Sequence, residues 1–506
     1  MDFIKKVTIG RTFLIINFMF TISYFIVLAF FFPIGNILLF CLLIIASLFH
    51  LWQAMGYIHS VWPRKVKRSF NASYKPEVAI FITVTGEPTE IVERTLKSAL
   101  AMNYPDFNVY ILNDGLVAGR DNWQEAEELA NEYGVRCITR TQAGGAKAGN
   151  INNALKLTKE HFIVVFDADH VPKKRFLKST MGYFKDRHVG FVQSPQYYSN
   201  HKQNVVTMGA WEQQALFFGA ILKGKDTLNS TFMCGTNMVI RRKALDEVGG
   251  MSEESIAEDF LTSLLIHEKK WKSVYVPTVL AEGLAPEDFL SYYKQQFRWA
   301  RGSLEIVFRY NPFARRGLTM AQRVQYLSSA SFYLSGFVVV LNATLPLIYF
   351  FFGITALTIN TMTLALIFIP YILIVLYTIQ LTSNFTYTFR ALSFSLSSFP
   401  IHLKAVFQIL TGKKSGFVVT SKKALSGNHG YLSLPHITYV AVVIGGVVVG
   451  VMREGFSPSL LSNLAWATVY IAIFMPFIAA SFYKAKPAII PEKKALKMTQ
   501  VKETAT

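Results

Sequence analysis

Apolar residues gather in long uncharged runs on both sides of one mixed stretch. Five runs lack any charged side chain and reach the roughly 20 residues that a membrane-spanning helix needs: 12–32, 34–63, 324–389, 424–452 and 456–483. The run at 324–389 is long enough for two spans with a turn near residues 353–360. We therefore predict about six spans in three pairs, at 1–63, 321–388 and 424–484, and a soluble block at 64–320.

Two other segments have a helical apolar period without being apolar throughout. In residues 389–412 an apolar side chain recurs every three or four positions among Ser and Thr, which predicts an amphipathic helix at the membrane interface within a 389–423 region. Residues 289–307 show a similar period and predict a second such helix at the end of the soluble block. The charged, aromatic-poor tail at 485–506 is expected to be disordered.

Within the soluble block, short β-branched runs alternate with helix-like stretches. The predicted strands lie at 77–85, 108–112, 135–140 and 161–166. The predicted helices between them lie at 89–102, 121–133 and 147–158. This alternation predicts an α/β domain with a mainly parallel sheet, and ligands of such sheets bind beyond the carboxyl ends of the strands.

Acidic residues follow two of these predicted strands. Asp114 comes after the second strand, and Asp167 and Asp169 come after the fourth as a D-x-D sequence. Residues i and i+2 of an extended chain share a face, so Asp167 and Asp169 converge. Mg²⁺ or Mn²⁺ would hold two such carboxylates together with substrate phosphates. A solvated acidic turn is the alternative for D-x-D in isolation.

Three further positions carry candidate chemistry. Lys147 follows a Gly-rich turn and opens a predicted helix, an arrangement that suits a diphosphate, although a flexible helix entry would look the same. Glu258 and Asp259 open another helix, where acids ordinarily complement the helix dipole. The stretch KQQFRWARGS at 294–303 places a Trp between two Arg residues near the first apolar run after the block.

Composition fits a membrane protein and limits the partners. Charged residues make up 16% of the chain, against roughly a quarter in soluble domains, and the formal net charge is +19. With six spans, the Lys- and Arg-rich segments all fall on one side of the membrane, and they are 2–6, 64–68, 413–414, 422–423 and 484–497. Because positive residues favour the cytosolic side, we expect both termini and the soluble block to be cytosolic. Because this bias explains much of the charge, we expect no nucleic-acid partner. The cysteines Cys41, Cys137 and Cys234 are far apart, and no disulfide is expected.

Four motifs follow one another in a fixed order. They are Asp114, DAD at 167–169, AED at 257–259, and a Q-x-x-R-W motif formed by Gln295, Arg298 and Trp299. Together they resemble the membrane-embedded, processive glycosyltransferases of family 2, the cellulose synthase and hyaluronan synthase group, over roughly residues 75–425. Two stretches favour the cellulose synthase branch. GFVVTSKKA at 416–424 resembles the F-x-V-T-x-K gating loop, and FMCGTNMVIRR at 232–242 resembles the F-C-G-S/T stretch.

The resemblance implies a GT-A glycosyltransferase domain inserted between the spans of a protein of the cell (inner) membrane. The implied reaction is processive, inverting β-glycosyl transfer from a nucleotide sugar, nearest to UDP-glucose, onto cellulose or a related β-glucan that leaves through the spans. It implies that Asp259 is the general base, that Glu258 orients its neighbours, and that Mg²⁺ or Mn²⁺ binds Asp169 and Asp167. Implied donor-binding residues are Asp114, Lys147, Asp167, Arg298, Thr420 and Lys422. Implied acceptor-binding residues are Trp299, Gln295, Cys234 and Gly235.

The chain departs from the family pattern at three places. Ala257 stands where Thr is usual, Asn113 replaces the first of two aspartates, and TVTGEP at 83–88 stands where PTYNEP is usual. The last two lie where the uridine would bind. The chain does not continue into the PilZ domain of bacterial cellulose synthases, so any cyclic di-GMP control is expected to act through a separate regulatory or export subunit.

Two alternatives to polymerisation stay open at this point. One is non-processive transfer of a sugar to a lipid phosphate carrier, which needs the same nucleotide site. The other is an inactive scaffold or a transporter in a polysaccharide export complex. The expected partners of the leading interpretation are the nucleotide sugar, the growing polysaccharide and membrane lipid.

Overall fold

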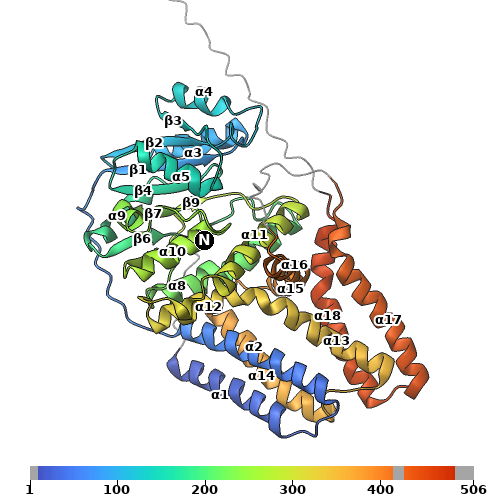
Figure 1. Cartoon of the computed structure of the whole chain (residues 1–506). Coiled ribbons are helices and arrows are strands. Elements are labelled where there is room, and N and C mark those ends of the chain that lie inside the picture. The colour runs from blue at the N-terminus through green and yellow to red at the C-terminus, as the bar shows by residue number, and fades with distance from the viewer. Residues whose placement is uncertain (1–9, 360, 414–426, 485–506) are drawn as a thin grey trace, which may run out of the picture.

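The computed structural model describes residues 10–359, 361–413 and 427–484 and divides into a sheet-containing block and a set of long helices (Figure 1). Figure 1 shows the sheet at one end of the molecule and helices α1, α2 and α14 at the other, with α10, α11 and α12 between them. The bounds of these middle helices are Glu258–Glu268, Phe289–Phe308 and Met320–Ser331.

The central sheet has seven strands in the order β3-β2-β1-β4-β7-β6-β8. Its strands are β1 (Val78–Val84), β2 (Phe107–Asn113), β3 (Arg136–Thr139), β4 (Phe162–Asp167), β6 (Val189–Gln193), β7 (Met238–Arg241) and β8 (Lys272–Tyr275). Strands β1 to β4 pair in parallel, β7 runs antiparallel to β4 and β6, and β6 pairs in parallel with β8. The mainly parallel α/β sheet predicted from the sequence is therefore confirmed.

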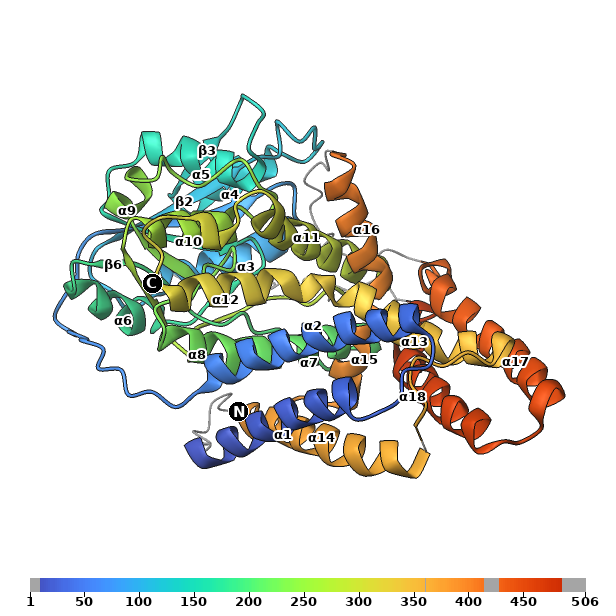
Figure 2. The same cartoon turned by 60° about the horizontal axis from the view of Figure 1, so that its bottom comes forward.

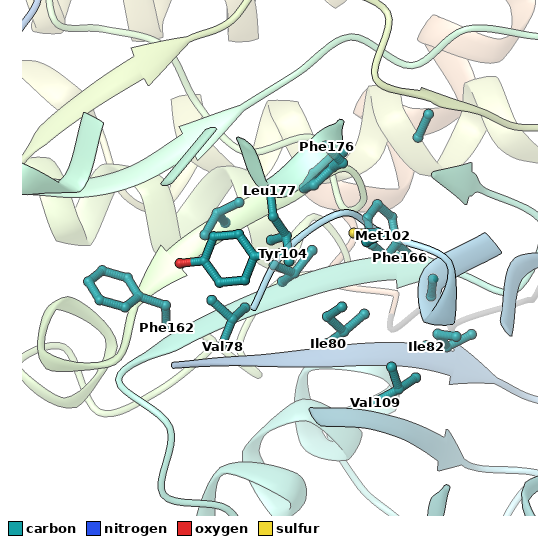
Figure 3. Close-up of a cluster of buried hydrophobic side chains, with 14 of the residues drawn as sticks. Val78, Ile80, Ile82, Met102, Tyr104, Val109, Phe162, Phe166, Phe176 and Leu177 are labelled. Carbon is teal, nitrogen blue, oxygen red and sulfur yellow. The ribbon is translucent and has the colours of Figure 1, made fainter. Parts of the chain in front are cut away.

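Helices cover both faces of this sheet. They are α3 (Thr89–Leu100), α4 (Glu125–Glu132), α5 (Ala146–Leu157), α6 (Phe176–Thr180), the 3-10 helix η1 (Met181–Lys185) and α9 (Arg242–Asp246). Strand β1 is buried along its whole length, as expected for a parallel strand covered on both faces. On one face Val78, Ile80 and Ile82 pack against a cluster that includes Phe166 and Phe176 (Figure 3).

The register of the parallel strands brings their polar ends together. Thr83 of β1 lies opposite Asp167 of β4, and Val84 of β1 lies opposite Asn113 of β2. The small sheet formed by β5 (Val171–Pro172) and β9 (Ala281–Glu282) then holds the chain just after Asp169. The carboxyl edge of the sheet is thus the place where the predicted acidic residues meet.

Six helical segments of the described residues are long and apolar enough to cross a membrane: Arg11–Phe30, Ile37–Val61, Met320–Phe352, Met362–Thr382, Gly430–Glu454 and Pro458–Ser481. They contain α1 (Arg11–Phe30), α2 (Ile37–Val61), α12 with α13 (Ser335–Phe352), α14 (Thr361–Thr382), α17 (Leu434–Glu454) and α18 (Pro458–Ser481). Figure 2 shows α1 beside α14, and Tyr24 and Tyr371 stack across this pair with ring centroids 4.3 Å apart. The predicted number of spans is confirmed.

Residues 389–412 form two helices where one was predicted. Helix α15 spans Phe389–Ser397 and α16 spans Phe399–Leu410. Pro400 has no backbone N–H to continue the hydrogen bonding of α15, so the helix ends and a new one begins. Helix α15 packs on α18 and on α7 (Val205–Leu216), while α16 packs on α11 and α13. The two helices therefore join the soluble block to the spans.

Candidate active site

One cavity of about 500 Å³ opens at the carboxyl edge of the sheet, and we call it the sheet-edge cavity. Its lining includes residues predicted from every motif that the structure describes: Asp114, Lys147, Asp167, Cys234, Gly235, Glu258, Asp259, Gln295, Arg298 and Trp299. They come from the ends of β2 and β4, the start of α5, the turn before β7, the start of α10 and the middle of α11. Thr420 and Lys422 lie outside the described residues.

Lys147 joins the sheet edge to the turn before β7. Its Nζ donates to the Asp167 carboxylate and, at 2.7 Å, to the Gly235 carbonyl oxygen. Gly235 has a φ of +80°, and a Cβ added there would lie 3.3 Å from Asp259 Oδ2. A side chain at this position would be strained and would press on the carboxylate, so glycine suits the turn.

Asp167, Asp169 and His170 form a candidate metal centre. One donor atom from each lies within 4.8 Å of the others. Asp169 is buried, and both of its carboxylate oxygens have polar neighbours. Its Oδ2 accepts the Leu284 backbone N–H at 3.0 Å, and its Oδ1 lies 3.3 Å from His170 Nδ1. The buried His170 Nε2 has no hydrogen-bond partner among the described residues. Two carboxylates and an imidazole are a donor set that fits a divalent cation.

The sequence predicted only two of the three residues of this cluster. It placed Asp167 and Asp169 on one face of a strand, but β4 ends at Asp167, and the two carboxylates converge through the turn that follows. His170 was not predicted. It directly follows the D-x-D sequence, and this position next to two carboxylates could have indicated a third metal ligand.

Asp114 binds a residue that the sequence did not single out. Arg140 donates from Nε to Asp114 Oδ1 at 2.8 Å and from Nη2 to Oδ2 at 2.7 Å, and both side chains are buried. Burial raises the pKa of Asp114, and the Arg140 contact opposes that shift. Arg140 also donates to the carbonyl oxygens of Gly144 and Ala146. Asp114 thus fixes the turn before α5, and its direct role toward a nucleotide stays a prediction.

Glu258, which is buried, and Asp259, which is half-buried, lie next to each other in the first turn of α10. Burial, followed by the charge of neighbouring Glu258, raises the pKa of Asp259 to about 7. The Phe260 backbone N–H, at 2.7 Å, and the cations Lys147 and Arg298 oppose this shift. Burial also raises the pKa of Glu258. A carboxylate that titrates near neutral pH is well suited to accept a proton from a hydroxyl group.

A second cavity, of about 360 Å³, begins where the first one ends, and we call it the helix-lined cavity. Five residues line both cavities: Gln196, Cys234, Ala257, Asp259 and Trp299. Beyond them the second cavity runs between α2, α7, α11, α12 and α15, and its lining is mainly apolar and aromatic, with side chains such as Phe217, Phe218 and Phe232. Side-chain amides and hydroxyls are interspersed among them: Gln53, Tyr57, Ser60, Gln213, Gln325, Ser328 and Ser329. The sequence did not predict these residues, because they lie on apolar helices far apart along the chain.

Lys225 is the buried cation of the helix-lined cavity. It belongs to α8 (Leu222–Asp226), and its Nζ donates to the Gln325 carbonyl oxygen at 2.8 Å and to Gln325 Oε1 at 2.9 Å. Burial lowers the pKa of Lys225 to about 7. The amide and carbonyl partners hold α8 against α12 at the wall of the helix-lined cavity.

Comparison with known proteins shows which families the chain resembles. Residues 76–302 match a family model described as glycosyltransferase like family 2, and residues 246–455 match one described as cellulose synthase. Together these two matches cover residues 76–455, so this part of the chain is similar to the glycosyltransferases of family 2 and to the cellulose synthases. The family resemblance predicted from the motifs is thereby confirmed.

Two relatives of this chain are each named cellulose synthase catalytic subunit (UDP-forming). That of Pseudomonas fluorescens (strain SBW25) is 30% identical over 450 residues, which cover 84% of this chain and 60% of the relative. That of Komagataeibacter sucrofermentans is 28% identical over 470 residues, covering 87% of this chain and 61% of the relative. The chain therefore spans about three fifths of the length of these relatives.

A solved structure supports the fold. A mannosyltransferase from Pyrobaculum calidifontis, in complex with GDP-mannose and Mn²⁺, aligns with a TM-score of 0.52 at 15% identity, covering 74% of this chain and all of the other. With its six apolar helices and cellulose synthase relatives, the chain is an integral membrane protein.

The metal cluster gives a first prediction. Replacing Asp169 by Ala removes a buried carboxylate from the donor set, so the affinity for Mn²⁺ in the presence of UDP should fall at least about tenfold. Titration calorimetry of the detergent-solubilised protein measures this. Asp186→Ala is the control, because Asp186 is a carboxylate that binds Lys272 outside the cavity and should leave the affinity within about twofold of wild type. Equal Mn²⁺ affinity in wild type and Asp169→Ala would contradict the assignment.

Proposed function

We propose that this protein is a processive, inverting β-glycosyltransferase that adds sugar units from a UDP-linked donor to a growing polysaccharide. One observation carries the proposal: Asp259 and Trp299 line both the sheet-edge cavity and the helix-lined cavity. A donor in the first cavity and an acceptor in the second would meet at these two side chains. Because these relatives are named cellulose synthase catalytic subunit (UDP-forming), the proposed donor is UDP-glucose and the proposed product is cellulose or a related β-glucan.

In this proposal the sheet-edge cavity binds the donor. The N-terminus of α5 and Lys147 face the position of the diphosphate, and Arg298 approaches it from α11. Asp114 acts through Arg140, which fixes the turn that leads into α5. Mg²⁺ or Mn²⁺ held by Asp167, Asp169 and His170 would neutralise charge on the departing diphosphate.

Asp259 is the proposed general base. In-line attack by an acceptor hydroxyl on the anomeric carbon releases a proton, and a partly desolvated carboxylate with a pKa of about 7 can take it up at neutral pH. Glu258, beside it, contributes the negative charge that helps to raise the pKa of Asp259. Lys147 and Arg298 keep that increase from going further.

The acceptor is proposed to lie in the helix-lined cavity. Trp299 presents an aromatic face on which a pyranose ring can stack, and Cys234 lies on the same passage between the cavities. Gln295 precedes Trp299 by about one helical turn, and Gly235 leaves room beside Asp259. The mixed lining between α2, α11 and α12 suits a neutral polysaccharide leaving toward the spans, because its aromatic side chains can face sugar rings while its amides and hydroxyls meet sugar hydroxyl groups. With the catalytic block cytosolic, the product would cross the inner membrane.

The direct test reconstitutes the protein in lipid vesicles and supplies radiolabelled UDP-glucose, UDP-N-acetylglucosamine, UDP-glucuronate and GDP-mannose in turn, with Mg²⁺ or Mn²⁺. We expect incorporation from UDP-glucose into material of many sugar units, digestible by a β-glucan-specific hydrolase. A single labelled sugar extracted with lipid would replace this proposal by transfer to a lipid phosphate carrier. Labelling from none of the donors would support the inactive scaffold or transporter.

The pKa of Asp259 gives a pH prediction. Below about pH 7 the raised pKa leaves Asp259 protonated and unable to accept a proton, so the transfer rate at saturating donor should fall about tenfold per pH unit on the acid side and level off above pH 7. Asp259→Asn should remove most activity at every pH while UDP binding stays near that of wild type. A wild-type rate that is flat between pH 5 and pH 8, or Asp259→Asn activity above a tenth of wild type, would show that Asp259 is not the base.

A further inference from the structure

Helix α11 presses closely against the turn that leads into α10. A Cβ added to Gly302 of α11 would lie 2.4 Å from the Cβ of Ala257, the residue just before α10 begins. Two real side-chain carbons cannot approach this closely, so only glycine allows the contact. The backbone of α11 therefore lies directly against the turn that presents Glu258 and Asp259.

A hydrogen-bonded serine holds the same turn. Ala257 offers no side chain to cap the N-terminus of α10. Instead, Ser255 Oγ accepts the Ala257 backbone N–H at 3.1 Å and donates to Glu305 Oε2 at 2.7 Å. One hydroxyl group thus links the start of α10 to a carboxylate on α11.

Glu305 belongs to a buried charged pair. Its side chain and that of Arg301 are 4% and 3% exposed, and Arg301 Nη2 lies 3.7 Å from Glu305 Oε1. Arg301 Nη1 also donates to Gln408 Oε1 of α16 at 2.9 Å. Because a buried carboxylate is costly without partners, the Ser255 hydroxyl group and the Arg301 guanidinium together fix where Glu305 lies.

We propose that Ser255 and Glu305 are positioning residues, which set the distance between the proposed base and the acceptor. Trp299 lies on α11 less than two helical turns before Glu305, so one rigid helix carries both the acceptor-stacking ring and the carboxylate that holds the Asp259 turn. Ser255 and Glu305 line neither cavity, so they act on the reaction through Asp259. This inference rests on the proposed function, in which Asp259 is the base.

The inference separates turnover from donor binding. Asp114, Lys147 and Asp167 lie on β2, α5 and β4, away from the Ser255 link, so its loss should leave the donor site intact. Ser255→Ala and Glu305→Met should each lower kcat with UDP-glucose about tenfold or more, while KM for UDP-glucose and the affinity for UDP stay within about twofold of wild type. Ser255→Thr keeps the hydroxyl group and should retain most of the kcat.

The test includes a double variant and a matched control. Because both residues act through one hydrogen bond, Ser255→Ala combined with Glu305→Met should be no slower than the slower single variant. Glu254→Gln is the control, since Glu254 lies on the same turn but accepts the Tyr310 hydroxyl at 2.6 Å on its exposed side. This control should keep a wild-type kcat.

Several results would overturn the inference. They are a wild-type kcat in Ser255→Ala, additive losses in the double variant, and losses of UDP affinity equal to the losses of kcat, which would indicate general damage to the fold. A Ser255→Thr variant as slow as Ser255→Ala would also contradict it. If the wild-type protein transfers sugar but Asp259→Asn remains active, the proposed function fails first, independently of the Ser255 and Glu305 results.

Discussion

Two adjacent carboxylates, the buried Glu258 and the half-buried Asp259, line the sheet-edge cavity, and Asp259 also lines the helix-lined cavity, so the surrounding structure must stabilise their charge. Removing carboxylates from water is expensive, and burial alone would favour their protonated forms. The Phe260 N–H, Lys147 and Arg298 oppose this and leave the pKa of Asp259 at about 7. The pKa of Asp259 therefore depends on three separate elements, α5, α10 and α11.

The same constraint explains how the soluble block is joined to the spans. The parallel strands place the donor side at their carboxyl edge, while α11 and α12 carry the chain from that edge toward the membrane (Figure 1). Helix α11 presents Trp299 to both cavities and, one turn later, packs Gly302 against the turn before Asp259. The interior of the spans and the sheet edge are thus connected through one helix.

Local sequence patterns predicted much of this arrangement. The features that these patterns did not predict depend on contacts between residues far apart in the sequence. Strands β1 to β4 were predicted to within one or two residues because their apolar runs are short and bounded by turns, and their ends correctly predicted that Asp114 and Asp167 would line one cavity. The sequence did not predict the roles of Arg140, His170 and Glu305. Their partners are set by turns and by packing between helices, and the spacing of apolar residues along the chain carries no information about either. The break at Pro400 was visible in the sequence but was outweighed by the continuous apolar period around it.

The central claim is that donor and acceptor meet at Asp259 and Trp299, at the junction of the two cavities. Electron cryo-microscopy of the protein in lipid nanodiscs, after incubation with UDP-glucose and Mn²⁺, tests it most directly. The account predicts a sugar ring stacked on Trp299, its terminal hydroxyl group about 3 Å from Asp259, and further sugar density in the helix-lined cavity. A sugar chain bound elsewhere, or lipid filling the helix-lined cavity while polymer is being made, would contradict it.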